Sequence, residues 1–196
     1  MDAIRTRAEE YITKETDAKF RKEVEELLKN NDEKELEDRF YRDLEFGTAG
    51  LRGIIGGGFN RMNSYVVRRA TQGLCDYLLK TLTGKPLSAC IAYDSRRYSN
   101  QFALDTALIF AANGIKAYLF TGVRPTPVLS FAIQHLKADT GIVVTASHNP
   151  PAYNGYKAYW NDGAQIIPPH DKGIIDCVNT VTSIHYMDKE EALKKG

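Results

Sequence analysis

The sequence lacks any long hydrophobic run, since none of its apolar stretches approaches the roughly 20 residues needed to cross a bilayer. Its amino terminus is charged and helical in pattern, unlike a signal peptide. The net charge is only +1 at pH 7, so the chain has none of the strongly basic character of nucleic-acid-binding proteins. We therefore expect a soluble, cytoplasmic protein with no membrane or nucleic-acid partner.

Cysteine and histidine are scarce and scattered. The three cysteines, Cys75, Cys90 and Cys177, lie far apart in apolar segments, which disfavours both a disulfide framework and a zinc site. No H-x-x-x-H or C-x-x-C spacing occurs that could chelate a transition metal. We expect reduced core cysteines and no soft-metal centre.

The hydrophobic content, 43%, is sufficient for one compact domain that buries roughly 70% of its unfolded surface. Residues 1–44 interleave charges of both signs, and their apolar positions repeat at helical spacing. These positions are Phe20, Val24, Leu27 and Leu28. Asp32 followed by Glu35 is a capping pair for a second helix. Residues 1–44 are therefore predicted to form an amphipathic helical arm.

From residue 45 onward, strand and helix patterns alternate. The predicted helices are 64–80, 99–113, 127–137 and 169–182. The predicted strands are 89–93, 115–120, 140–144 and 156–160. Alternation of this kind favours right-handed crossovers and a largely parallel sheet covered on both faces. Residues 45–196 are therefore predicted to form a three-layer α/β/α domain with a mixed, mostly parallel sheet.

Three details of this prediction depend on local signals. No helix separates the last two strands, so strand 156–160 should pair antiparallel and lie at a sheet edge. Residues 46–63 are expected to form a loop, after which Ser64 caps the next helix. The charged tail, 185–196, is expected to be frayed.

The most informative stretch is T-A-S-H-N-P, residues 145–150. It follows a short β-branched run that is typical of a strand buried on both faces, and the prolines after Asn149 end regular structure. Ser147 should therefore lie on a loop at the carboxyl end of a central strand, where open α/β sheets bind ligands. Ser, His and Asn before proline are also common turn formers, so the motif alone has two interpretations.

Two further segments add chemistry to this loop. Lys157 follows ten positions after Ser147, in a second β-like run. Far upstream, residues 46–53 form a glycine-rich stretch that carries Arg52. Its glycines are Gly47, Gly50 and Gly53. An arginine can grip phosphate oxygens in bidentate fashion, and glycines let backbone N–H groups approach a phosphate closely.

Together these three segments resemble the α-D-phosphohexomutase superfamily, the phosphoglucomutases and phosphomannomutases. Its members carry a phosphorylatable serine in a T-x-S-H-N-P loop, then an N-G-x-K segment, and an R-G loop near the amino terminus. The stretches 45–63 and 160–170 are most similar to the phosphoglucomutase-2 and phosphopentomutase branch. The resemblance covers the first of the four domains of these enzymes, so domains II–IV would be absent from this chain.

The resemblance implies that Ser147 carries phosphate while glucose 1-phosphate and glucose 6-phosphate interconvert through glucose 1,6-bisphosphate. A phosphomannomutase or phosphopentomutase domain and a non-catalytic phosphosugar-binding module are the alternatives. The resemblance also implies a Mg²⁺ shared by the Ser147 phosphate and a D-x-D-x-D loop of the second domain. No such triplet occurs in this sequence, so the metal site would be incomplete. We expect the isolated chain to be inactive, with the remaining domains and a phosphosugar as its partners.

The other candidate residues have more than one interpretation. Lys157 or His148 could transfer the serine proton, and His148 could instead orient the loop or be a simple turn residue. Thr145 and Asn149 are expected to hold the loop by hydrogen bonds.

Asp94 and Arg96 follow another parallel strand and therefore lie on the same sheet edge. By resemblance they support the active-site loops, and otherwise they are a helix cap and a surface arginine. Arg124, on a third strand-end loop, is a weaker candidate. A Ser-His hydrolase is disfavoured, because there is no G-x-S-x-G elbow and no acidic partner placed for a triad.

Overall fold

The computed structural model describes residues 2–48 and 50–195, so Met1, Ala49 and Gly196 lie outside the described residues. At its centre is a five-stranded sheet with the strand order β1-β5-β4-β2-β3. The strands are β1 (Gly50–Ile54), β2 (Ser88–Tyr93), β3 (Lys116–Leu119), β4 (Thr140–Val144) and β5 (Tyr153–Trp160). The helices of the body are α4 (Ser64–Thr81), α5 (Ser99–Ala112), α6 (Thr126–Leu136), α7 (His170–Thr180) and α8 (Lys189–Lys195).

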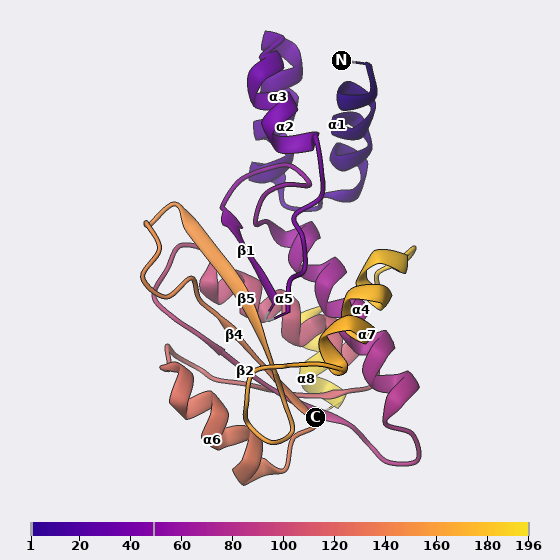
Figure 1. Cartoon of the computed structure of the whole chain (residues 1–196), viewed down its shortest axis with the longest axis vertical. Coiled ribbons are helices and arrows are strands. Elements are labelled where there is room, and N and C mark those ends of the chain that lie inside the picture. The colour runs from indigo at the N-terminus through magenta and orange to yellow at the C-terminus, as the bar shows by residue number, and fades with distance from the viewer. Residues whose placement is uncertain (1, 49, 196) are drawn as a thin grey trace.

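Two hydrophobic cores cover the two faces of the sheet. The larger core packs α4, α5 and α7 against one face, and the smaller core packs α6 against the other. Figure 1 shows the helices of the body on both sides of the sheet. β2 is parallel to β3 and β4, whereas β5 is antiparallel to β4 and β1. The predicted α/β fold with a mixed sheet is therefore confirmed.

The prediction that strand 156–160 lies at a sheet edge is wrong. β5 pairs antiparallel with β4 as expected, but β1 pairs with its other side and forms the edge. β1 lies inside the glycine-rich stretch that was predicted to be a loop. Its five residues, G-L-R-G-I, include two glycines, which weaken the strand signal of the sequence.

Two other local predictions are corrected. The cap of α4 is Asn63, whose Oδ1 accepts a hydrogen bond from the Val66 N–H at 3.0 Å, so Ser64 is already the first helical residue. The tail is helical as α8, because the Asp188 carboxylate accepts a hydrogen bond from the Glu191 N–H at 2.9 Å. Acidic residues in the first turn of α8 and lysines in its last turn also suit the helix dipole.

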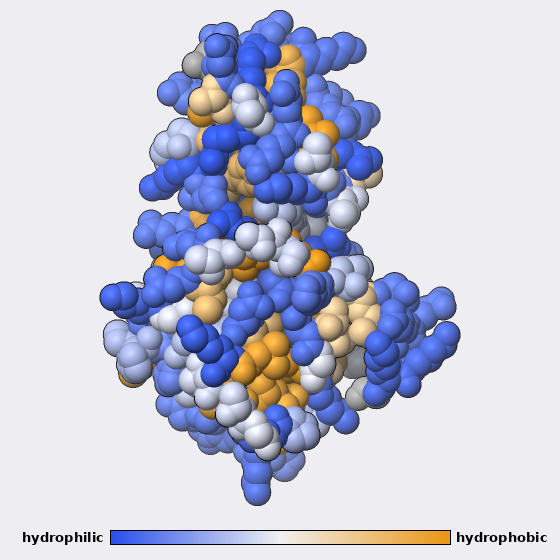
Figure 2. Space-filling model, turned by 90° about the vertical axis from the view of Figure 1, so that its right-hand side faces the viewer, coloured by the Kyte–Doolittle hydropathy of each residue, from blue (hydrophilic) through white to orange (hydrophobic). Residues whose placement is uncertain are grey.

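The arm consists of three helices, α1 (Asp2–Lys14), α2 (Ala18–Asn30) and α3 (Glu33–Phe40). Asp32 caps α3 by accepting a hydrogen bond from the Glu35 N–H at 3.2 Å, as predicted. The arm has its own buried cluster, which includes Tyr11 and Phe40 and extends to Phe59 of the body. It lies at one end of the molecule (Figure 1), and on the face in Figure 2 its surface is mostly hydrophilic.

No helix among the described residues is long and apolar enough to cross a membrane. The three cysteines are free; Cys75 and Cys90 are buried, and Cys177 is partly exposed. Burial raises the pKa of all three thiols: that of Cys90 to about 11, that of Cys75 well above its ordinary value, and that of the partly exposed Cys177 as well.

A thiol reagent at about pH 8 should modify Cys177 of the folded protein more than about tenfold faster than Cys75 or Cys90, because the thiolate is the reactive form and the reagent can reach only a partly exposed thiol. Unfolding returns the pKa of all three thiols to about 8.5, and their rates should then converge. Mass spectrometry of peptides after timed alkylation measures this order. Equal rates at all three cysteines in the folded protein would contradict it.

Candidate active site around the Ser147 loop

Ser147 lies on the loop that follows β4, and its side chain is exposed. Its backbone has a φ of +53°, the left-handed region, which non-glycine residues rarely adopt and which costs about 1–3 kcal/mol. Two hydrogen bonds fix this turn: the Ser147 N–H donates to Thr145 Oγ1 at 2.9 Å, and the Asn149 N–H donates to the Ala146 carbonyl at 3.0 Å. The loop therefore holds the serine hydroxyl in one place and presents it to solvent.

Lys157 is the side chain that meets this hydroxyl. Its Nζ donates a hydrogen bond to Ser147 Oγ at 2.9 Å. The pairing register explains the contact, because Lys157 lies opposite Val143, close to the end of β4 from which the serine loop departs. Side chains of paired residues point to the same face, and α6 packs on that face over β2 and β4. The face over β5 and β1 therefore remains available to the site.

Arg52 approaches the same loop from β1. It lies opposite Gly155 of β5, and its Nη1 donates a long hydrogen bond to Asn149 Oδ1 at 3.5 Å. A side chain at Gly155 would place its Cβ 2.6 Å from the Thr145 carbonyl oxygen, so glycine allows β5 to pass directly beneath the loop. Two cationic side chains, from two neighbouring strands, therefore converge on the loop that carries the exposed serine.

Arg96 holds the loop from behind. Its guanidinium donates hydrogen bonds to four backbone carbonyls of the 147–153 stretch. The distances are 2.8 Å to Ser147, 2.6 Å to Asn149, 3.0 Å to Pro150 and 3.1 Å to Tyr153. Asp94 Oδ1 accepts hydrogen bonds from the Arg96 N–H at 2.9 Å and from Ser99 Oγ at 2.7 Å. Arg96 is 14% exposed and is thus a largely covered support of the loop rather than a surface arginine.

The model of the phosphoglucomutase/phosphomannomutase alpha/beta/alpha domain I matches residues 43–185. The chain belongs to this family. It is 44% identical to the phosphopentomutase of Homo sapiens over 162 residues, 79% of this chain and 26% of that protein. It is 40% identical to the glucose 1,6-bisphosphate synthase of Mus musculus over 176 residues, 86% of this chain and 28% of that protein. The predicted branch is therefore confirmed.

A solved structure supports the same assignment. A phosphoglucomutase/phosphomannomutase family protein from Burkholderia thailandensis matches with a TM-score of 0.59 and 27% identity, over 72% of this chain and 31% of that one. The chain thus spans less than a third of the length of these three relatives.

The glycines of this phosphohexomutase domain have structural roles. The Gly47 and Gly50 N–H groups donate to each other's carbonyls at 2.9 and 3.0 Å, so both amides are engaged within the chain rather than open to a phosphate. Gly53 lies on the buried face of β1, where an added Cβ would meet the Leu44 side chain at 3.0 Å. The contribution of this stretch to the site is Arg52, which the glycines help to place.

His148 and Arg124 are not drawn into this cluster. The exposed His148 side chain makes no hydrogen bond within the described ranges 2–48 and 50–195. Arg124 donates to the neighbouring Val123 carbonyl at 2.8 Å and lies over the Phe120 ring.

The sequence gave no role to Asn154, which is fully buried. Its Nδ2 donates hydrogen bonds to the Arg97 carbonyl and to Ser99 Oγ behind the site. The N-G pair before Lys157 is the signal that could have revealed it.

Magnesium is the cofactor that the family implies, and the residues of this chain do not suit it by themselves. Among the described residues there is no group of three or more His, Cys, Asp or Glu side chains that could hold a metal. The charged neighbours of the Ser147 loop are cationic, and the nearby carboxylate of Asp94 is paired with Arg96. Mg²⁺ prefers an octahedral shell of oxygen ligands, of which this loop offers little.

Proposed function

We propose that this chain is the phosphate-carrying domain of a sugar phosphomutase and that Ser147 is the carrier. The observation that supports this most directly is the 2.9 Å hydrogen bond from Lys157 Nζ to Ser147 Oγ on an exposed, conformationally strained turn. A phosphoserine has a charge close to −2, which Lys157 and Arg52 can balance. Ser147 is therefore suited to hold a phosphoryl group between two transfers.

The reaction has two steps. First, Ser147 Oγ forms a bond to the phosphorus of a sugar bisphosphate, and the bond from that phosphorus to the sugar oxygen breaks. The Ser147 hydroxyl loses its proton in this step, and the released sugar oxygen gains one. In the second step the hydroxyl oxygen of another sugar phosphate bonds to the phosphorus and releases its proton to solvent, the bond from phosphorus to Ser147 Oγ breaks, and Ser147 Oγ gains a proton. Lys157 already donates to this oxygen and is the proton source that we assign to the second step.

The sugar is glucose phosphate or pentose phosphate in this proposal. Glucose is the sugar implied by the family resemblance, and the mouse relative named a glucose 1,6-bisphosphate synthase supports it. The human relative named a phosphopentomutase favours the pentose as a second candidate. The residues that would contact the sugar ring are not among those of the Ser147 loop. The glucose and ribose bisphosphates must therefore be compared experimentally as phosphoryl donors.

Because full mutase turnover is not expected of the isolated chain, the test follows a single transfer. Incubation with glucose 1,6-bisphosphate, or with the corresponding ribose bisphosphate, is expected to add one phosphoryl group, which intact mass spectrometry detects. The Ser147→Ala variant should remain unmodified, and the faster donor identifies the sugar class. A phosphoryl group that is acquired equally by Ser147→Ala would contradict the proposal, because the carrier would then be another residue.

The same assay separates the two candidates for proton transfer. Return of the phosphoryl group from Ser147 to a sugar monophosphate should slow by about 100-fold or more in Lys157→Met, which removes the proton donor. His148→Asn, which removes the other candidate from the Ser147 loop, should slow it less than tenfold. A reversed order of the two variants would assign the proton transfer to His148.

A further inference from the structure

The helical arm contacts both ends of the chain segment that brings Arg52 into the site. We call residues 44–62 the β1 segment. Within the sheet, β1 has one neighbour, β5, because it lies at the edge. The match to the family domain begins at residue 43, so the helices of the arm lie outside it. An edge strand with one partner needs a second support to hold a functional side chain in place.

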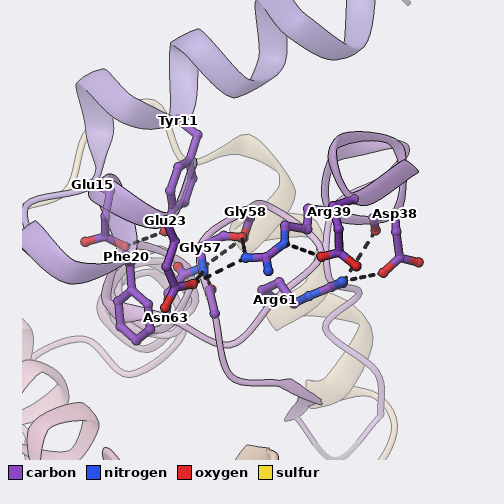
Figure 3. Close-up of polar contacts among 12 residues, drawn as sticks. Tyr11, Glu15, Phe20, Glu23, Asp38, Arg39, Gly57, Gly58, Arg61 and Asn63 are labelled. Carbon is purple, nitrogen blue, oxygen red and sulfur yellow. Dashed lines mark hydrogen bonds and ion pairs between the residues drawn. The ribbon is translucent and has the colours of Figure 1, made fainter. Parts of the chain in front are cut away.

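The first contact lies directly after β1, at the glycine loop 56–58. Glu23 Oε2, on α2, accepts a hydrogen bond from the Gly57 N–H at 2.9 Å. Arg39 Nη1, on α3, donates to the Gly57 carbonyl at 3.0 Å and to Glu23 Oε2 at 3.3 Å. Figure 3 shows both arm side chains directed at this loop. Both polar groups of the Gly57 backbone are therefore bound by charged side chains of the arm.

The loop also packs against the arm without space for a side chain. A Cβ at Gly57 would lie 2.3 Å from the Phe20 carbonyl oxygen and 2.8 Å from Val24 Cγ2, both on α2. Gly58 has a φ of +130°, and a Cβ there would lie 2.8 Å from Arg39 Cβ on α3. The arm and the loop thus form one packed unit.

The loop is connected rigidly to β1. The Gly56 N–H donates to the Met62 carbonyl at 3.1 Å, and the Met62 N–H donates to the Ile54 carbonyl at 2.8 Å. Asn63 Nδ2 donates to the carbonyls of Gly56 and Gly58 at 2.9 and 2.7 Å. A displacement of the loop would therefore reach Ile54, two residues from Arg52.

The second contact lies before β1. Asp43 accepts hydrogen bonds from Arg7 of α1 and from Arg69 of α4, each at 2.5 Å. Burial alone would raise the pKa of Asp43, but its hydrogen bonds to Arg69 and Arg7 outweigh burial and hold the pKa below the ordinary value. The Leu44 N–H donates to the Phe59 carbonyl at 2.8 Å and closes the base of the β1 segment.

From these contacts we infer that Glu23 and Arg39 are positioning residues, which hold Arg52 against the Ser147 loop through Gly57; this inference rests on the proposed function. Arg52 reaches the loop only through a 3.5 Å hydrogen bond to Asn149, so a small shift of β1 removes the contact. A misplacement of about 1 Å at a catalytic site can cost about 100-fold in rate. The arm is thereby part of the site without touching substrate.

Two glutamates on the same arginine provide a matched test. Arg39 pairs with Glu23 at 3.3 Å and with Glu35 at 3.1 Å, and of these two carboxylates only Glu23 bonds the glycine loop. In Glu23→Gln, the amides of β1 should exchange with deuterium about tenfold faster, since the hydrogen bond to the Gly57 N–H loses its charge and the ion pair with Arg39 is removed. Phosphorylation of Ser147 in the same variant should slow about threefold to tenfold, when it is measured at a temperature well below the midpoint of thermal unfolding. Glu35→Gln should change neither quantity by more than about twofold.

Gly57→Ala is the second variant, because its Cβ pushes the loop away from α2 without removing a charge. It should reproduce the faster β1 exchange of Glu23→Gln, with an unchanged circular dichroism spectrum as evidence of folding. Equal β1 exchange in Glu23→Gln and Glu35→Gln would overturn the inference, and so would faster exchange with an unchanged rate of phosphorylation. If the wild-type chain does not acquire a phosphate on Ser147, the proposed function is contradicted instead. The deuterium exchange of β1 in Glu23→Gln and Glu35→Gln then tests by itself whether the arm positions β1.

Discussion

Replacing Arg96 by methionine is expected to slow phosphorylation of Ser147 by about 100-fold while the sheet remains folded. Methionine keeps the apolar part of the side chain and removes every donor of the guanidinium. The Ser147 and Asn149 carbonyls would lose the hydrogen bonds at 2.8 and 2.6 Å that tie the loop to the β2 end of the sheet. The left-handed conformation of Ser147 would then lack its main external support.

The cost in stability should be smaller than the cost in rate. The carbonyls that Arg96 binds lie on an exposed loop, where water can replace the lost donors, so the free energy of unfolding should fall by about 1–3 kcal/mol. Arg96→Lys keeps the charge but not the fork of donors, and it should recover only part of the rate. The neighbouring Arg97 is exposed, and Arg97→Met is the matched control.

Three measurements check this prediction: the rate of phosphoryl uptake, the urea midpoint, and deuterium exchange over residues 145–150. Faster loop exchange in Arg96→Met but not in Arg97→Met is the expected pattern. If both variants took up phosphate at the wild-type rate, the loop would hold its conformation without Arg96, and the support that we assign to this side chain would be wrong.

The Ser147 contact was accessible from the sequence because each of its elements has a strong local signal. A β-branched run followed by Asn-Pro-Pro predicts a strand that ends before the serine, and a second β-like run predicts a neighbouring strand that carries Lys157. The register that brings Lys157 to 2.9 Å is a property of the assembled sheet. The residue types indicated that Lys157 and Ser147 belong to one site, whereas the distance between Lys157 Nζ and Ser147 Oγ could be learned only from the structure.

The arm contacts and β1 were not accessible in this way. β1 is a strand of five residues with glycine at Gly50 and Gly53, and tertiary pairing with β5 overrides its weak propensity. The link from Glu23 to Gly57 spans 34 positions and joins an exposed-looking charge to a glycine, a pair without any local pattern. An amphipathic arm is expected to expose its charges to solvent, which holds for most of them but not for Glu15, Glu23 and Arg39.

Gly50 gives the second prediction with a large effect, because β1 can pair with β5 only if this residue has no side chain. Its φ is +122°, and an added Cβ would lie 1.8 Å from the Tyr156 carbonyl oxygen, far inside any real contact. The obstacle is backbone of the central sheet, which cannot move aside as a flexible side chain could. Gly50→Ala should therefore separate the start of β1 from β5 and lower the free energy of unfolding by about 3 kcal/mol or more.

Gly47 is the matched control for this substitution. It lies three residues earlier in the same stretch, and among the described residues a Cβ there would meet only the Gly50 carbonyl oxygen at 3.8 Å, an ordinary contact. Gly47→Ala should change the free energy of unfolding by less than about 1 kcal/mol. Urea unfolding of both variants, followed by circular dichroism, measures the difference. Equal stability of the two would mean that β1 does not depend on Gly50, whereas the expected gap shows that this glycine sets the position of Arg52 by closing β1 onto β5.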